Sequence, residues 1–60
     1  MTKKHIFKDC EVITTKMMQA SGTIPYYCRV FINDQQRLAM TIHADSHKEA
    51  AAEARKMLVL

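Results

Sequence analysis

The stretch DSHKEAAAEARKMLVL, residues 45–60, decides the fold because it predicts a helix more clearly than any other part of the chain. Ser46 and Glu49 stand three residues apart, which is the spacing of a capping box at a helix start. Four alanines follow between positions 50 and 54, and alanine is the strongest helix former. Positions 50, 51, 54, 57 and 58 are apolar and share one helical face. That face has to be buried against another element.

Three strands are predicted upstream of this helix, from alternating side chains and β-branched content. The segment 6–16 (IFKDCEVITTK) alternates imperfectly, which predicts a strand with a bulge or a change of face. The segment 26–32 (YYCRVFI) gives the strongest strand signal, and 37–44 (RLAMTIHA) alternates cleanly. We expect residues 1–5 to be a frayed start, 17–25 a long hairpin connection, and 33–36 a turn.

This order of elements predicts an α+β fold in a single small domain over residues 1–60. Consecutive strands with short connections form an antiparallel meander, so we expect a three-stranded meander packed on one C-terminal helix. The residues expected in the core are Val12, Cys28, Val30, Ile32, Leu38, Met40, Ile42, Ala50, Ala51, Ala54, Met57 and Leu58.

Chain length and composition narrow the class of protein. A chain of 60 residues buries a small core and is often stabilised further by a disulfide, a metal or a second copy. Neither a signal peptide nor a run of eighteen apolar residues is present, so we expect a cytoplasmic protein with reduced thiols at Cys10 and Cys28, and no membrane partner. A homodimer is the favoured means of extra stability. The net charge of +3 favours acidic partners such as nucleic acid.

The sheet face that the helix leaves uncovered is the predicted site of function. Arginine can bind phosphate through two hydrogen bonds, and tyrosine can stack or hydrogen-bond, so a cationic and aromatic face suits DNA or RNA. The residues expected to contact nucleic acid are Lys8, Tyr27, Arg29, Arg37, Thr41 and His43. Alternatively, Phe7, Tyr27 and Phe31 on this face form a homodimer interface, since exposed apolar patches mark interfaces. A peptide or small-ligand surface is a third interpretation.

Metal binding and catalysis are weakly indicated. His43 and His47 stand four residues apart, with Cys28 a neighbouring candidate, but this step crosses the junction of strand and helix. Because no Cys-x-x-Cys or His-Glu-x-x-His spacing is present, no metal site or other cofactor is predicted. A cysteine beside a histidine is a conceivable nucleophile, but buried strand cysteines are usually inert. We therefore expect no enzyme activity, and infer no small-molecule substrate.

Residues 27–58 resemble the arm-type DNA-binding domains of phage and transposon integrases. The features that carry the resemblance are Tyr27-x-Arg29-x-Phe31, the turn at Asn33-Asp34, and Ser46-x-x-Glu49-Ala50. It implies three antiparallel strands backed by one helix, and DNA read by the sheet face. A small phage or prophage product is the kind of protein that we expect. The alanine-rich helix start is also similar to the last helix of double-stranded-RNA-binding domains, although their first helix has no counterpart here. The strand–helix layout also resembles that of small antitoxin-like domains.

Overall fold

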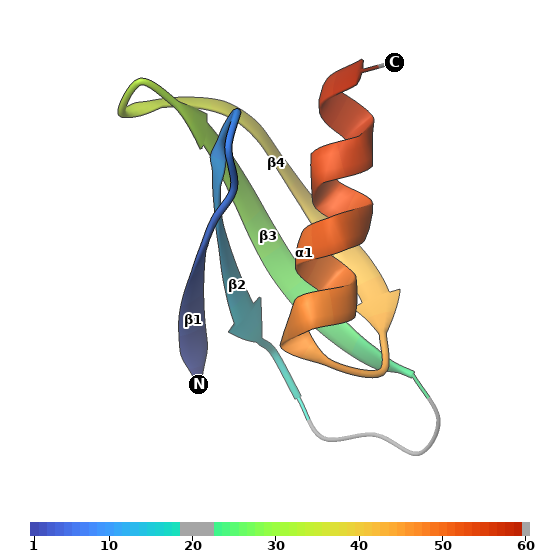
Figure 1. Ribbon diagram of the computed structural model, residues 1–60. Coiled ribbons are helices and arrows are strands. Elements are labelled where there is room, and N and C mark those ends of the chain that lie inside the picture. The colour runs from blue at the N-terminus through green and yellow to red at the C-terminus, as the bar shows by residue number, and fades with distance from the viewer. Residues whose placement is uncertain (19–22, 60) are drawn as a thin grey trace.

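The structure, a computed structural model, describes residues 1–18 and 23–59 and contains one antiparallel sheet and one helical segment (Figure 1). The sheet is a meander in the order β1-β2-β3-β4. Its strands are β1 (Thr2–Ile6), β2 (Glu11–Lys16), β3 (Ile24–Ile32) and β4 (Gln35–Ala44). Helix α1 (His47–Lys56) follows, and a 3-10 turn (Met57–Val59) continues from it. The α+β class, the antiparallel meander and the C-terminal helix are confirmed.

The prediction of three strands was wrong, because the expected frayed start forms strand β1. The segment 6–16 is not one strand either: it holds the end of β1, a turn closed by Phe7 N–H donating to Cys10 O at 2.8 Å, and β2. The sequence of β1 does not predict a strand, because lysine is uncommon in strands. Lysine is nevertheless common on edge strands, where it discourages pairing with other chains. Lys4 and Glu11 form an ion pair of 3.4 Å between β1 and β2.

Two connections define the rest of the meander. Asn33 and Asp34 both have positive φ, 51° and 65°, as in the type I′ turn that best joins two twisted strands. The β3–β4 hairpin is therefore tight, and β4 starts at Gln35, before the expected Arg37. The expected connection over 17–25 includes residues 19–22, which lie outside the described residues. At its ends, Met17 N–H donates to Pro25 O at 3.0 Å, and β3 starts at Ile24.

Helix α1 begins as its sequence predicts. The Ser46 side chain accepts a hydrogen bond from Glu49 N–H at 3.2 Å, which satisfies one of the free donors at the helix start. Lys56 and Glu53 pair at 3.2 Å on the exposed side. The α-helix ends at Lys56, so it is shorter than the expected segment that runs to residue 60. No helix among the described residues is both long enough and apolar enough to cross a lipid bilayer.

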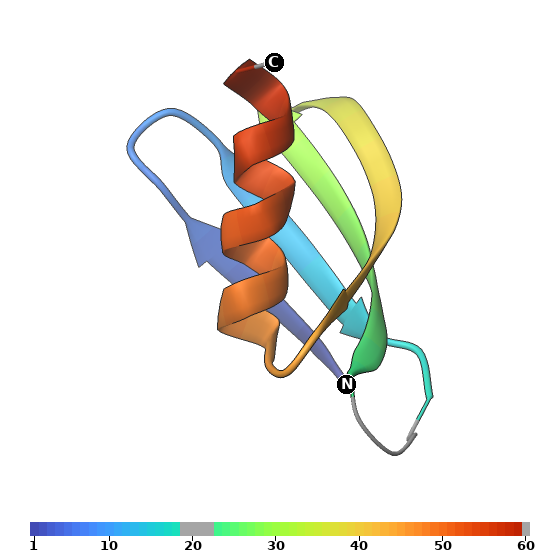
Figure 2. The same cartoon turned by 90° about the vertical axis from the view of Figure 1, so that its right-hand side faces the viewer.

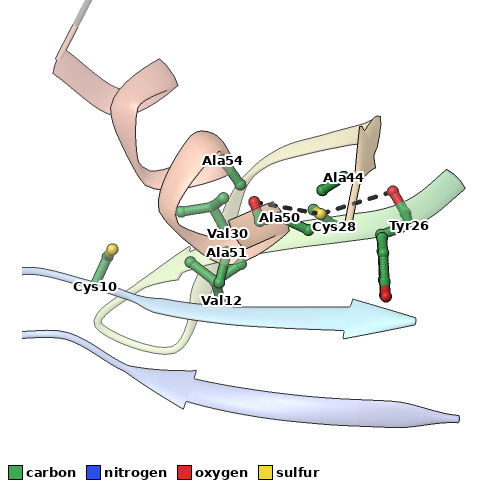
Figure 3. Close-up of a cluster of buried hydrophobic side chains, with 9 residues drawn as sticks. All are labelled: Cys10, Val12, Tyr26, Cys28, Val30, Ala44, Ala50, Ala51 and Ala54. Carbon is green, nitrogen blue, oxygen red and sulfur yellow. Dashed lines mark hydrogen bonds between the residues drawn. The ribbon is translucent and has the colours of Figure 1, made fainter. Parts of the chain in front are cut away.

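The core lies between α1 and one face of the sheet (Figures 1 and 2). Ala50, Ala51 and Ala54 are fully buried, so the helix backbone lies close to the sheet, where Val12 and Val30 are also fully buried (Figure 3). The remaining buried apolar residues are Cys10, Tyr26, Cys28 and Ala44. The partly buried residues packed around them are Phe7, Ile24, Ile32, Leu38, Met40, Ile42 and Leu58.

Residues expected in the core mostly lie there, with one error. Met57 is 47% exposed, because the chain leaves the α-helix at that residue and its side chain no longer continues the buried face. Cys28 is fully buried, and its thiol lies 3.7 Å from Tyr26 O and 3.9 Å from Ala50 O, on the side of β3 that faces the helix (Figure 3). The even-numbered side chains of β3 therefore point toward the helix, and the odd-numbered ones point away.

Candidate functional site

The uncovered sheet face, here called the open face, is organised around β3. Strand register places its side chains in rows, such as Lys4–Ile13–Arg29–Ala39 and Thr2–Thr15–Tyr27–Thr41. The residues of the open face are Thr2, Lys4, Ile6, Glu11, Ile13, Thr15, Pro25, Tyr27, Arg29, Phe31, Gln36, Ala39, Thr41 and His43. Tyr27, Arg29, Phe31, Thr41 and His43 thus share one surface, as their parity in the sequence predicts.

Arg29 occupies the middle of this face. Its guanidinium lies over the Phe31 ring, 5.9 Å from the ring centroid, which is a cation–π arrangement. The side chain is half-buried, and its buried Nε finds no hydrogen-bond partner among the described residues. A buried donor without an acceptor is costly, and Nε is covered by the chain itself, so it gains an acceptor from outside only if the side chain moves. The other nitrogens of the guanidinium are not among the buried atoms, and they are the ones that the open face offers.

The charge of the open face is mainly positive. Glu11 is the only carboxylate among its residues, and Lys4 approaches it to 3.4 Å. That pair is partly exposed, so its contribution to stability is small and Lys4 can exchange partners at little cost. Arg29 has no such carboxylate partner among the ion pairs of the described residues. The centre of the face therefore presents an unneutralised cation between two aromatic rings.

Three of the predicted residues lie at the margin of the open face or away from it. Arg37 is the extra residue of a bulge in β4, since Val30 pairs with Leu38 and Phe31 pairs with Gln36. Lys8 is exposed in the β1–β2 turn, at one end of the sheet. Phe7 was expected on the open face but packs against the core on the helix side, where Arg55 lies over its ring at 5.1 Å.

A histidine pair that was not anticipated lies on the helix side of the sheet. The Thr14 hydroxyl lies 3.0 Å from His5 Nε2 and 2.7 Å from His47 Nδ1. The His47 ring also meets the Tyr26 ring edge-on, with centroids 4.7 Å apart. Thr14 is fully buried, so its hydroxyl joins elements of the fold and is not presented to a substrate.

The pKa values of both histidines are lowered. Burial is the main cause for each, because an imidazolium loses hydration on leaving water. The positive charge of Lys3 adds to the effect at His5. At His47 the further causes are the positive charges of Lys3, the amino terminus and Lys16, and the charge that His5 carries when it is protonated. Both shifts favour the neutral form of the imidazole.

The residues considered for metal binding are not brought together. His43 lies on the open face, His47 on the helix side, and Cys28 pairs with Met40 beneath the helix. No group of three His, Cys, Asp or Glu side chains suited to a metal occurs in the described part of the chain. Cys10 and Cys28 are free thiols. Burial is the main factor that raises the pKa of each, which makes them poor nucleophiles at neutral pH.

Two open hollows lie near the β1–β2 turn. One, of about 250 Å³, is lined by Phe7, Asp9, Ala52, Arg55 and Lys56. Arg55 Nε donates to Asp9 Oδ1 across it at 3.0 Å, and this bond is the main reason that the pKa of Asp9 is lowered. The second, of about 320 Å³, is lined by Ile6, Phe7, Lys8, Asp9, Cys10, Glu11, Asn33 and Asp34. Both are close to or below the usual size of ligand pockets, and both are open.

Comparisons with protein-family models, curated proteins and solved structures find no match for this chain.

Proposed function

We propose that the chain is a non-enzymatic binding module that contacts nucleic acid through its open face. The observation that carries the proposal is the arrangement on β3, where the half-buried guanidinium of Arg29 stands between Tyr27 and Phe31 and has no carboxylate partner among the ion pairs of the described residues. Phosphate oxygens are strong acceptors for a guanidinium, and base rings stack on exposed aromatic side chains. The same surface therefore offers groups for both parts of a nucleotide.

The spacing of the aromatic side chains on the open face favours single-stranded nucleic acid over a duplex. Tyr27 and Phe31 lie on the same face of β3 with Arg29 between them. They are four residues apart, which is about 13–14 Å at the rise of a β-strand. Bases must be unstacked from a duplex to reach such side chains, whereas those of a single strand are free to do so. The resemblance to integrase arm-type and double-stranded-RNA-binding domains implies a nucleic-acid partner as well, but it does not favour a single strand, since the second of these families takes a duplex.

The central test is the affinity of Arg29→Ala for a labelled, mixed-sequence single strand. Loss of the guanidinium should weaken binding by about 1–3 kcal/mol, measured by fluorescence anisotropy at low salt. Lys48→Ala is the matched control, because it removes one exposed cation from the helix and none from the open face. Equal effects of the two substitutions would reduce the role of Arg29 to net charge and contradict the proposal. A duplex of the same sequence should bind more weakly.

Self-association is a second candidate for the same face, favoured by its apolar residues. Ile6 is 74% exposed, Ile13 and Phe31 are half-buried, and the core under α1 is built largely from small side chains. A second copy that covered this face would supply the stability that a short chain lacks. Phe31→Lys should then convert a dimer to a monomer in light scattering, while Thr41→Lys, at the exposed margin, should change the mass less. An unchanged mass in Phe31→Lys removes this candidate.

A further inference from the structure

Three elements of the fold meet at the buried hydroxyl of Thr14. His5 comes from β1, Thr14 from β2 and His47 from the first turn of α1. We propose that His5, Thr14 and His47 form a proton-sensitive latch, which fastens β1 and the start of α1 to β2 at neutral pH and loosens β1 when the imidazoles are protonated. This inference concerns the fold and does not depend on what the open face binds.

The latch requires neutral imidazoles because a single hydroxyl serves both of them. The Thr14 oxygen lies 2.7 Å from His47 Nδ1 and 3.0 Å from His5 Nε2, and a hydroxyl has one hydrogen to donate. One imidazole therefore accepts from Thr14, and the other donates to it. Once the accepting imidazole is protonated it has no acceptor nitrogen, so the Thr14 hydroxyl faces two donors and loses its own acceptor.

The surroundings of the latch oppose protonation from every side. The amino group of Met1 lies just before β1, Lys3 belongs to β1 and Lys16 to β2, and all three charges disfavour a proton on His47. The Tyr26 ring of β3 packs edge-on against His47 and contributes no negative charge while it is neutral. His47 is also the first residue of α1, at the positive end of the helix dipole. None of these neighbours is a carboxylate that could pair with an imidazolium. Protonation is therefore relieved by separation of β1 and the start of α1 from β2.

Strand β1 is the element that should move. It lies at the edge of the sheet, and its residues are exposed except for His5, which is half-buried. Apart from the backbone ladder, its side-chain links to β2 are the Thr2–Thr15 contact of 3.1 Å, the Lys4–Glu11 pair of 3.4 Å and the His5–Thr14 bond. The first two are exposed, where water competes for the same groups. Release of β1 would uncover the edge of β2 and remove Lys4 from the open face.

Amide hydrogen exchange of the full chain tests the latch residue by residue. Protection factors, corrected for the chemical exchange rate, should fall by about tenfold or more in β1 between about pH 7.5 and pH 5, and by less in β3. The double variant His5→Gln, His47→Asn keeps a neutral donor and a neutral acceptor close to the original nitrogens. It should retain β1 protection at the lower pH. The control His43→Gln removes an exposed imidazole from the open face and should behave like the parent chain.

A second variant, Thr14→Val, tests the hydroxyl itself. It keeps the β-branched shape but offers neither donor nor acceptor, so β1 protection should already be low at about pH 7.5 and should change little on acidification. The latch is overturned by three results: constant β1 protection in the parent chain, a parallel fall in β1 and β3, or an unchanged pH response in the double histidine variant. The double variant keeps the test decisive if Thr14→Val does not fold.

Discussion

At the residue scale, Arg29 and Thr14 show what the sequence can and cannot predict. The position of Arg29 on the open face follows from the two-residue period of a strand, which needs only its own segment. The partners of Thr14 lie 9 and 33 residues away, so its burial depends on how three elements are assembled. A threonine in a strand predicts that its side chain lies on one of the two faces of the sheet, but not on which face. The side that it faces, and the histidines that satisfy its hydroxyl, follow from the tertiary fold.

The lowered pKa values of His5 and His47 predict that acid destabilises the fold. Because each pKa lies below 6.5 in the folded chain, the unfolded chain binds more protons around pH 6. The stability contributed by the two neutral histidines is complete above about pH 6.5, and it is lost as the pH falls through their folded pKa values. Urea unfolding across this range should show the decline. The double variant His5→Gln, His47→Asn should flatten it, and an equal decline in that variant would assign the effect to other groups.

At the scale of elements, the helix was predicted more accurately than the first strand. Ser46, Glu49 and the alanines all favour the same local structure, so α1 begins where its sequence indicates. Its end was predicted less well, because no glycine marks a stop and the last residues pass into a 3-10 turn. Strand β1 contains two lysines and a histidine, and no local signal favours it. It forms because β2 offers an edge with which it can pair.

Because α1 lies close to the sheet, substitutions of two adjacent alanines should differ sharply in their effect on the free energy of unfolding. Ala51 is fully buried against the sheet, whereas Ala52 is exposed on the helix. Ala51→Leu should lower the free energy of unfolding by about 1–3 kcal/mol, because a filled core has no room for three more carbons. Ala52→Leu changes helix propensity little and should stay within about 0.5 kcal/mol of the parent chain. Urea denaturation measures both, and similar values for the two would mean that the helix can move away from the sheet.

At the scale of the whole molecule, the class of fold was predictable and the number of strands was not. The meander and the single covering helix follow from the order of elements along the chain. The open face follows as well, since one helix covers one side of a sheet. The addition of β1 changes that face, because Thr2, Lys4 and Ile6 now extend it beside β2. Lys4 thereby becomes a third cation for the proposed surface, beside Arg29 on β3 and Arg37 in the β4 bulge at the margin of the face.

These three cations give a quantitative prediction for the proposed binding of a single strand. Each phosphate that is neutralised on a single strand contributes about −0.7 to the slope of log affinity against log salt. Lys4, Arg29 and Arg37 together should therefore give a slope of about −2. Arg37→Ala should reduce its magnitude by about 0.7, whereas Lys48→Ala, on the helix, should leave it unchanged. Anisotropy titrations from low to moderate salt measure the slope. An affinity that does not change with salt would exclude phosphate contact by these residues. Equal effects of Arg37→Ala and Lys48→Ala on the slope would place the nucleic acid elsewhere on the protein.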